Sequence, residues 1–290
     1  MQKKMKFFFF GFGQTARYFV TELIKSNKKF VFQATNTKKS KILNFNNRKF
    51  KSFKFKDDHY DKKILKQLQT AEYILISIPP RKKKDLVLKN FSKDLVNSNF
   101  KKLVYLSATS VYGDHGGRWV NENSKLKGKT IFGLARRATE KAWLNFRKNY
   151  ARDINILRVS GIYSKENNVL RKILKTNIYV KEKKYFSRIR VEDLAIIIKK
   201  TFFSKKKSMI LNASDNRPST NVEVANYAAK LLKIKKLKAV PISKFKNKMI
   251  KAFYKDSKKV SNKNMKEKLK IKLRYPTYQN GLRDIFNNFR

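Results

Sequence analysis

A glycine-rich turn joins an apolar run to a helical pattern near the start of the chain, and few folds accept that combination. Residues 5–10 read MKFFFF, and Gly11, Gly13 and Ala16 follow with the spacing G-x-G-x-x-A. The apolar run predicts a strand that is buried on both faces. Gly11 permits a tight turn, Gly13 lets a ligand approach the backbone, and Ala16 lets the next helix pack on the strand. The stretch therefore predicts the first strand, turn and helix of an α/β domain.

The turn also predicts a phosphate-binding site. A helix that begins near Gln14 presents free N–H groups, and these bind the pyrophosphate of a dinucleotide. The expected contacts are Gly11, Phe12, Gly13, Gln14 and Thr15. A turn without a ligand remains the alternative, because one G-x-G-x-x-A match is a weak signal.

Further strands and helices alternate along the chain with short connections. The hydrophobic pattern predicts strands at 30–34, 50–55, 73–78 and 102–106 and helices at 16–25, 64–68 and 86–96. This alternation indicates an α/β fold with a doubly wound parallel sheet, the Rossmann fold, and a small interleaved C-terminal substrate lobe. We expect a dinucleotide-binding domain over residues 1–160 and the substrate lobe, interleaved with the last strands and helices of the sheet, over 161–290. The lysine-rich segment after Lys233 is expected to be helical.

The residues after the second strand bear on the choice of dinucleotide. Such a site usually places a carboxylate there to bind the adenosine ribose. This chain has Thr35, Asn36 and Thr37, followed by Lys38 and Lys39, which favours NADP over NAD. After the third strand, Asp57 is a candidate adenine contact, with a solvated turn as the alternative.

Composition excludes several classes of function. The net charge is +52, but the basic residues are spread over the whole chain, so we expect no specific nucleic-acid partner. Non-specific polyanion binding that salt abolishes is the remaining possibility. The chain has no cysteine and only two histidines, which leaves little material for a metal site. Its N-terminal apolar run is interrupted by glycines, and no other run is long enough to span a membrane, so we expect a cytoplasmic monomer or homodimer.

Several later motifs occur together and in order. They are YLSATSVYGDHGG at 105–117, LRVSGIY at 157–163, FSRIRVEDLA at 186–195, NASD at 212–215 and a helical pattern at 221–232. With them the chain resembles the extended short-chain dehydrogenase/reductase superfamily, the NAD-dependent epimerase/dehydratase group, over nearly its whole length. The resemblance implies further cofactor contacts at Ser77, Ile78, Pro79, Ser107 and Arg136.

The chain departs from that family at its catalytic positions. The family has a Ser or Thr five residues before the V-Y-G glycine, and here this position is Ala108. The Tyr and Lys of the family's Tyr-x-x-x-Lys motif fall on Phe132 and Arg136. Phenylalanine has no ionisable proton, so the standard acid is missing. The resemblance therefore implies an atypical member, with Thr109, Tyr112 and His115 as candidate catalytic residues, each of which has a loop-capping role as its alternative.

The resemblance also implies a substrate lobe with Gly161, Tyr163, Arg188 and Arg190 as binding residues. Arginines there suit a small anionic, sugar-like substrate. The expected function is that of an oxidoreductase or an epimerase/dehydratase-like enzyme. The alternative is a catalytically silent NAD(P)-binding sensor or scaffold.

Overall fold

The computed structural model describes residues 4–81 and 84–288, which form two compact units. Of the described residues, the first unit contains 4–81, 84–107, 135–157 and 194–210, and the second contains 108–134, 158–193 and 211–288. The division into a domain at 1–160 and a lobe at 161–290 stays a prediction.

The first unit is a sheet with helices on both faces. Its strands are β1 (Met5–Phe10), β2 (Phe30–Asn36), β3 (Lys41–Phe45), β4 (Arg48–Lys56), β5 (His59–Tyr60), β6 (Tyr73–Ile76), β7 (Lys102–Ala108) and β9 (Ile154–Val159). Its helices are α1 (Gln14–Lys25), α2 (Lys63–Thr70), α3 (Leu86–Asn97) and most of α4 (Ile131–Tyr150) and α6 (Val191–Phe203).

The strand order confirms the predicted doubly wound fold. The strands lie in the order β9-β7-β6-β1-β2-β4-β3, and the pairs β1–β2, β1–β6, β2–β4 and β6–β7 are parallel. The chain adds strands on one side of β1 and then, from β6, on the other side. Ligands of open α/β sheets bind at such a reversal, beyond the carboxyl ends of the strands.

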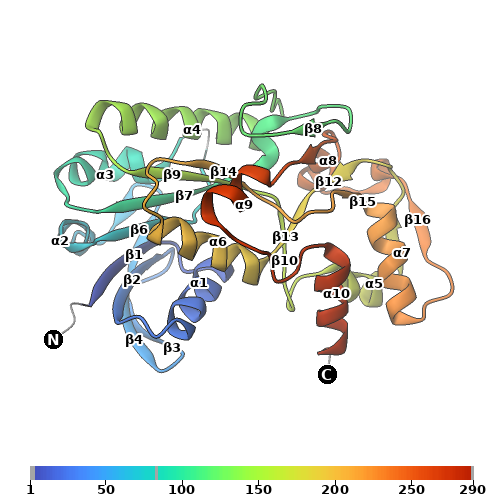
Figure 1. Cartoon of the computed structure of the whole chain (residues 1–290), viewed down its shortest axis with the longest axis horizontal. Helices are drawn as coiled ribbons and strands as arrows, with labels where there is room; N and C mark the ends of the chain where they lie inside the picture. The colour runs from blue at the N-terminus through green and yellow to red at the C-terminus, as the bar shows by residue number, and fades with distance from the viewer. Residues whose placement is uncertain (1–3, 82–83, 289–290) are drawn as a thin grey trace. The chain divides into compact units, whose positions relative to one another are not determined.

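Successive phenylalanine side chains of β1 point to opposite faces of the sheet, which explains why helices cover both faces. Phe8 and Phe10 belong to one buried cluster with residues of α2, α3 and α4, including Leu68, Phe91 and Trp143. Phe7 and Phe9 point the other way, where both rings contact Phe19 of α1 and Phe7 also contacts Phe202 of α6. Figure 1 accordingly shows α2, α3 and α4 on one side of these strands and α1 and α6 on the other.

The second unit is built from short strands and helices. Its elements are η1 (Thr109–Tyr112), β8 (Trp119–Val120), β10 (Gly161–Tyr163), α5 (Val169–Thr176), β11 (Ile178–Val180), β12 (Tyr185–Phe186), β13 (Arg188–Arg190), most of β14 (Ile210–Ala213), β15 (Ser219–Thr220), α7 (Asn221–Leu232), β16 (Lys238–Val240), η2 (Ile242–Lys244), α8 (Lys248–Phe253), β17 (Lys259–Val260), α9 (Lys263–Leu269) and α10 (Tyr278–Asn287). The short strands pair as β10–β13, β11–β16, β12–β15 and β8–β17. A core formed by α5, α7 and α10 includes Leu170, Val224 and Leu282.

Two secondary-structure expectations need correction. The expectation that the segment after Lys233 is helical holds only in part, because it contains β16 and β17 as well as α8, α9 and α10. These strands have three and two residues, too few to show a period of two. The sequence patterns also missed β3, which pairs antiparallel with β4 at the sheet edge, where polar and apolar residues mix.

Candidate functional site

The glycine turn has the geometry that its sequence predicts. Gly11 has φ +92°, and a Cβ there would lie 2.8 Å from Ile78 Cγ2 and 2.9 Å from Ser77 Oγ. Only glycine fits this position without strain. A Cβ on Gly13 would meet no described heavy atom within 4 Å. The space beside Gly13 is therefore open to a ligand.

Two side chains from neighbouring strands fasten this turn. Gly11 N–H donates to Thr35 Oγ1 at 2.9 Å, and Ser77 Oγ donates to the carbonyl oxygens of Phe10 at 3.1 Å and Gly11 at 3.3 Å. The structure thus brings together three predicted cofactor-site residues, Gly11, Thr35 and Ser77. The hydroxyl groups of Thr35 and Ser77 therefore bind the turn itself.

The start of α1 suits an anion. Gly13 is its N-cap, no described side chain caps the helix, and the first turn has no acidic residue. The Phe12 ring packs against Phe32 of β2 and Phe50 of β4, so its side chain is part of the apolar packing of the sheet. Gln14 and Thr15 begin the helix and are partly buried. Open space at Gly13 and an uncapped helix start fit the pyrophosphate of a dinucleotide.

The end of β2 presents lysines beyond a closed turn. Asn36 Oδ1 accepts Lys38 N–H at 2.7 Å, and Asn36 Nδ2 donates to Ser52 Oγ at 2.7 Å. Thr37, Lys38 and Lys39 are exposed. Asn36 therefore shapes the turn that holds these lysines at the surface.

The remaining predicted contacts of the first unit lie at the same strand ends. Asp57 adopts φ +55° in the turn after β4 and forms an ion pair with Arg81 at 2.7 Å, with both side chains about half exposed. Ile78 is partly buried and Pro79 is exposed, just beyond β6. An exposed ion pair adds little stability, so its rupture would free Asp57 at small cost.

Arg136 and Ser107 belong to a polar cluster at the end of β7. Arg136 Nη1 donates to Tyr105 OH at 2.8 Å and to the Leu106 carbonyl at 2.7 Å, while Ser107 Oγ donates to Glu140 Oε1 at 2.5 Å. Burial raises the pKa of Tyr105, so its phenol stays protonated. Arg136 in this arrangement orders the strand end.

The second unit contains a cavity of about 290 Å³. Its lining residues come from five segments: Ala108, Thr109 and Ser110; Thr130 and Phe132; Val159, Ser160 and Gly161; Tyr185, Phe186 and Ser187; and Ala252, Phe253, Asp256, Lys258 and Val260. The hydroxyl oxygens of Ser110 and Ser160 are buried without a partner among the described residues. Such groups are costly unless something pairs with them, so this cavity is the candidate substrate site.

The three predicted catalytic residues are placed differently. Thr109 lines the cavity, whereas Tyr112 and His115 are not among its described lining residues. Tyr112 OH donates to Asn212 Oδ1 at 2.7 Å and accepts from Arg158 Nη1 at 3.0 Å, and burial raises its pKa to about 12. His115 Nε2 lies 3.1 Å from the carbonyl oxygen of Tyr112 and 3.2 Å from that of Lys125. These contacts suit Tyr112 and His115 to structural roles.

Of the predicted substrate residues, three share a second cavity. It has a volume of about 450 Å³, and Gly161, Tyr163 and Arg188 are among its lining residues. Arg188 Nη1 donates to the carbonyl oxygens of Phe186 and Ser219 at 3.1 and 3.0 Å, and burial lowers the pKa of its guanidinium.

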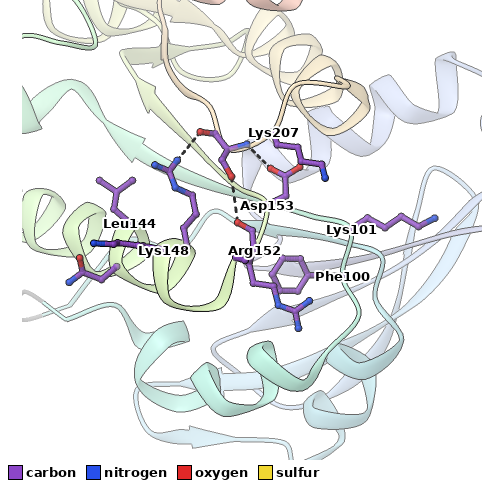
Figure 2. A pocket seen from close by; sticks show the side chains of 11 residues that line it. Phe100, Lys101, Leu144, Lys148, Arg152, Asp153 and Lys207 are labelled. Carbon is purple, nitrogen blue, oxygen red and sulfur yellow. Dashed lines mark hydrogen bonds between the residues drawn. The ribbon is translucent and has the colours of Figure 1, made fainter.

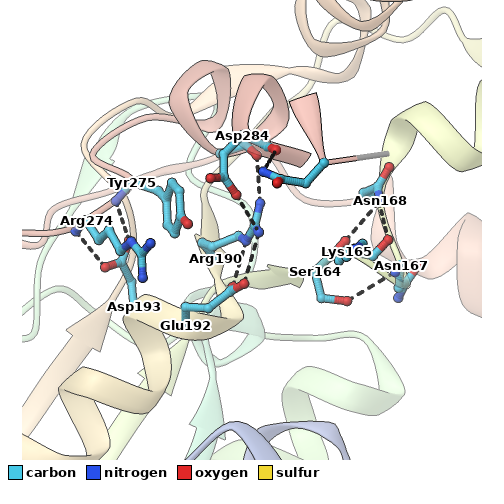
Figure 3. A network of polar contacts seen from close by, with 12 residues as sticks. Ser164, Lys165, Asn167, Asn168, Arg190, Glu192, Asp193, Arg274, Tyr275 and Asp284 are labelled. Atoms are coloured by element: carbon cyan, nitrogen blue, oxygen red, sulfur yellow. Dashed lines mark hydrogen bonds and ion pairs between the residues drawn. The ribbon is translucent and has the colours of Figure 1, made fainter. Parts of the chain in front are cut away.

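Arg190 serves another purpose in this unit. Figure 3 shows its guanidinium between Glu192 and Asp284, and it also donates to the Gly281 carbonyl. The Cζ atom of Arg190 lies 4.6 Å from the centroid of the Tyr275 ring. Arg190 therefore holds α10 against β13.

A third cavity, of about 810 Å³, lies in the first unit and is strongly basic. Figure 2 shows Lys101, Lys148, Arg152 and Lys207 around Asp153. The guanidinium of Arg152 donates to the carbonyl oxygens of Val96 and Ser98, so it caps the end of α3. Lys101 precedes β7, so this cavity lies at the amino edge of the sheet, away from where α/β ligands bind.

Two kinds of site are absent from the part of the chain that the structure describes. No group of three or more His, Cys, Asp or Glu side chains could hold a metal ion there. No described helix is both long and apolar enough to cross a membrane.

Lys258 and Asp256 are cavity residues that the sequence did not indicate. Their segment reads KDSKK at 255–259, which resembles the many solvated lysine runs of this chain. Nothing in that pattern signals burial. In the structure the segment is enclosed, since Ser257 and Lys258 are buried and β17 pairs with β8.

The model of the NAD dependent epimerase/dehydratase family matches residues 51–192. No curated protein sequence matches the chain.

Solved structures show the same fold at low identity. A functionally unknown conserved protein from Silicibacter pomeroyi DSS has a TM-score of 0.83 at 24% identity, over 99% of this chain and 100% of that one. UDP-glucose 4-epimerase from Thermotoga maritima, solved with UDP-glucose, has a TM-score of 0.80 at 15% identity, over 99% of both chains. dTDP-glucose 4,6-dehydratase from Bacillus anthracis, in complex with NAD, has a TM-score of 0.76 at 16% identity, over 98% of this chain and 96% of that one.

Proposed function

We propose that this chain, a member of the NAD-dependent epimerase/dehydratase family through residues 51–192, binds a nicotinamide dinucleotide on its first unit and a small, sugar-like substrate on its second. The open space beside Gly13 carries the first part of this proposal, because a Cβ there would meet no described atom within 4 Å. Gly11, Gly13 and the start of α1 would hold the pyrophosphate. The dinucleotide, when bound, would supply hydride transfer.

The proposed substrate site is the 290 Å³ cavity. Thr109 would donate a hydrogen bond to a substrate oxygen in place of the hydroxyl that Ala108 lacks, and Phe132 would contribute apolar wall. The Thermotoga maritima epimerase, whose structure holds UDP-glucose, supports a sugar-like substrate. The reaction class is oxidoreductase or epimerase/dehydratase-like.

We propose NADP as the preferred dinucleotide. Lys38 and Lys39 are exposed just beyond β2, and the adjoining Thr35, Asn36 and Thr37 include no carboxylate that would repel a 2′-phosphate. Asn36 supports this arrangement because its side chain holds Lys38 in the turn.

A catalytically silent NADP sensor is the second candidate. Ala108 and Phe132 favour it, because both line the cavity and neither can donate a proton. The two candidates make different predictions about turnover.

The test is dinucleotide binding by calorimetry, followed by turnover of UDP-glucose and of small carbonyl compounds. An enzyme should lose turnover by about a hundredfold in Thr109→Val, a typical effect of deleting one transition-state hydrogen bond. Thr109→Ser, which keeps the hydroxyl, is the matched control. Tight NADPH binding with no turnover of any compound would favour the sensor.

A further inference from the structure

The 290 Å³ cavity of the second unit has one ion pair in its wall, to which the proposed function assigns no role. Lys258 is only 9% exposed, and its Nζ lies 3.3 Å from Asp256 Oδ2. Both residues line the cavity. A buried ammonium is costly unless it is paired, and Asp256 provides the pairing charge here.

The backbone around Lys258 is fixed on both sides. Lys258 N–H donates to the Tyr185 carbonyl at 3.2 Å, and Val260 N–H donates to Ser187 Oγ at 2.9 Å. Asp114 Oδ1 accepts the N–H of Ser257 at 2.7 Å. Asp114 of the V-Y-G-D motif therefore holds the backbone next to Lys258, so the lysine side chain begins from a fixed position.

The surroundings favour loss of the Lys258 proton. Burial lowers the pKa of its amine, while the charges of Asp256 and Asp114 act in the opposite direction. Tyr185 is another ionisable residue of the same wall, and Lys184 acts on Asp114. Burial is the larger of these effects, so the pKa of the Lys258 amine lies below that of an exposed lysine.

The other walls define the ligand. The Phe186 and Phe253 rings are stacked at 4.4 Å with 15° between their planes, and Phe132 lies on the same cavity. The Lys258–Asp256 pair has no net charge. An uncharged portion of the substrate with a carbonyl or hydroxyl group and one apolar face, such as its monosaccharide unit, suits these walls.

We propose that Lys258 donates a further hydrogen bond to a carbonyl or hydroxyl oxygen of the substrate, in addition to that of Thr109, and that Asp256 is its positioning residue. This inference rests on the proposed function and names the residue that takes over from the absent tyrosine. Its test requires neither the dinucleotide nor turnover.

The test is labelling of the full chain with glycolaldehyde and cyanoborohydride at pH 7. The neutral amine condenses with the aldehyde and water leaves, and hydride from cyanoborohydride then reduces the imine to a secondary amine. Peptide mass spectrometry compares Lys258 with Lys255, an exposed lysine of the same segment. Lys258 should be modified faster than Lys255, because burial lowers the pKa of the Lys258 amine and leaves a larger share of it in the reactive neutral form. Equal or slower labelling would overturn the proposal.

Asp256→Asn tests the positioning role. Loss of the carboxylate charge should move the pH midpoint of Lys258 labelling downward, whereas Asp94→Asn, the same change in the first unit, should leave it in place. If the pH midpoint of Lys258 labelling is unchanged in Asp256→Asn, Asp256 is not the positioning residue of Lys258. If the wild type fails to bind a dinucleotide but Lys258 still labels fast, the proposed function fails and the reactive lysine stands.

Discussion

Thr35 Oγ1 accepts the N–H of Gly11 at 2.9 Å, which ties the end of β2 to the turn after β1. Thr35 is 2% exposed, so water does not replace this bond. Thr35→Val keeps the shape but removes the acceptor, and should lower the free energy of unfolding by about 1–3 kcal/mol. Urea denaturation measures this. Thr35→Ser should retain most of the stability, and a stable Thr35→Val chain would show that the turn does not depend on this bond.

Lys38 and Lys39 should determine the dinucleotide preference. Lys38→Ala with Lys39→Ala should weaken NADPH binding by about tenfold or more and leave NADH binding nearly unchanged, because only NADPH has the 2′-phosphate. Calorimetry at near-physiological salt removes long-range attraction by the other lysines. The control is Lys28→Ala with Lys29→Ala, an exposed pair that precedes β2. Equal losses for both dinucleotides would contradict the NADP assignment.

Asp215 should make stability depend on pH. Burial raises its pKa from 3.8 to about 7, and its Oδ2 has no partner among the described residues. As the pH rises from 3.8, the unfolded chain loses this proton while the folded chain keeps it, so stability falls until about pH 7. The slope is up to about 1.4 kcal/mol per pH unit.

Asp215→Asn mimics the neutral form and isolates this effect. The variant should match the wild type near pH 4 and be more stable than the wild type at pH 8, in urea denaturation across the range. Parallel stability curves for the two proteins would mean that Asp215 ionises normally in the fold.

Much of the fold could be predicted from local patterns. The buried run at β1 predicted a strand and the apolar stripe of α7 predicted a helix, because each pattern is long enough to identify its element. By contrast, β16 takes its shape from pairing with β11, which lies far away in sequence. Residues in such short strands carry no periodicity of their own.

The site could be predicted only in part for a similar reason. Gly11 and Gly13 were identified because their backbone role demands glycine at a fixed spacing. Lys258 was missed, because the sequence does not distinguish one enclosed lysine from many exposed ones. Tyr112 and His115 lie in the predicted motif, but the structure turns their polar atoms toward Asn212 and main-chain carbonyls. Whether they act in catalysis stays a prediction.

Calorimetric titration of Gly13→Asp with NADPH tests the account most directly. The new side chain enters open space, so the thermal midpoint should be nearly unchanged, while its charge lies where we propose that the pyrophosphate binds. Asn27→Asp, the same charge change just beyond the other end of α1, should bind as the wild type does. We predict no detectable NADPH binding by Gly13→Asp. Unchanged affinity in a folded Gly13→Asp chain would contradict the assignment of this turn as the dinucleotide site.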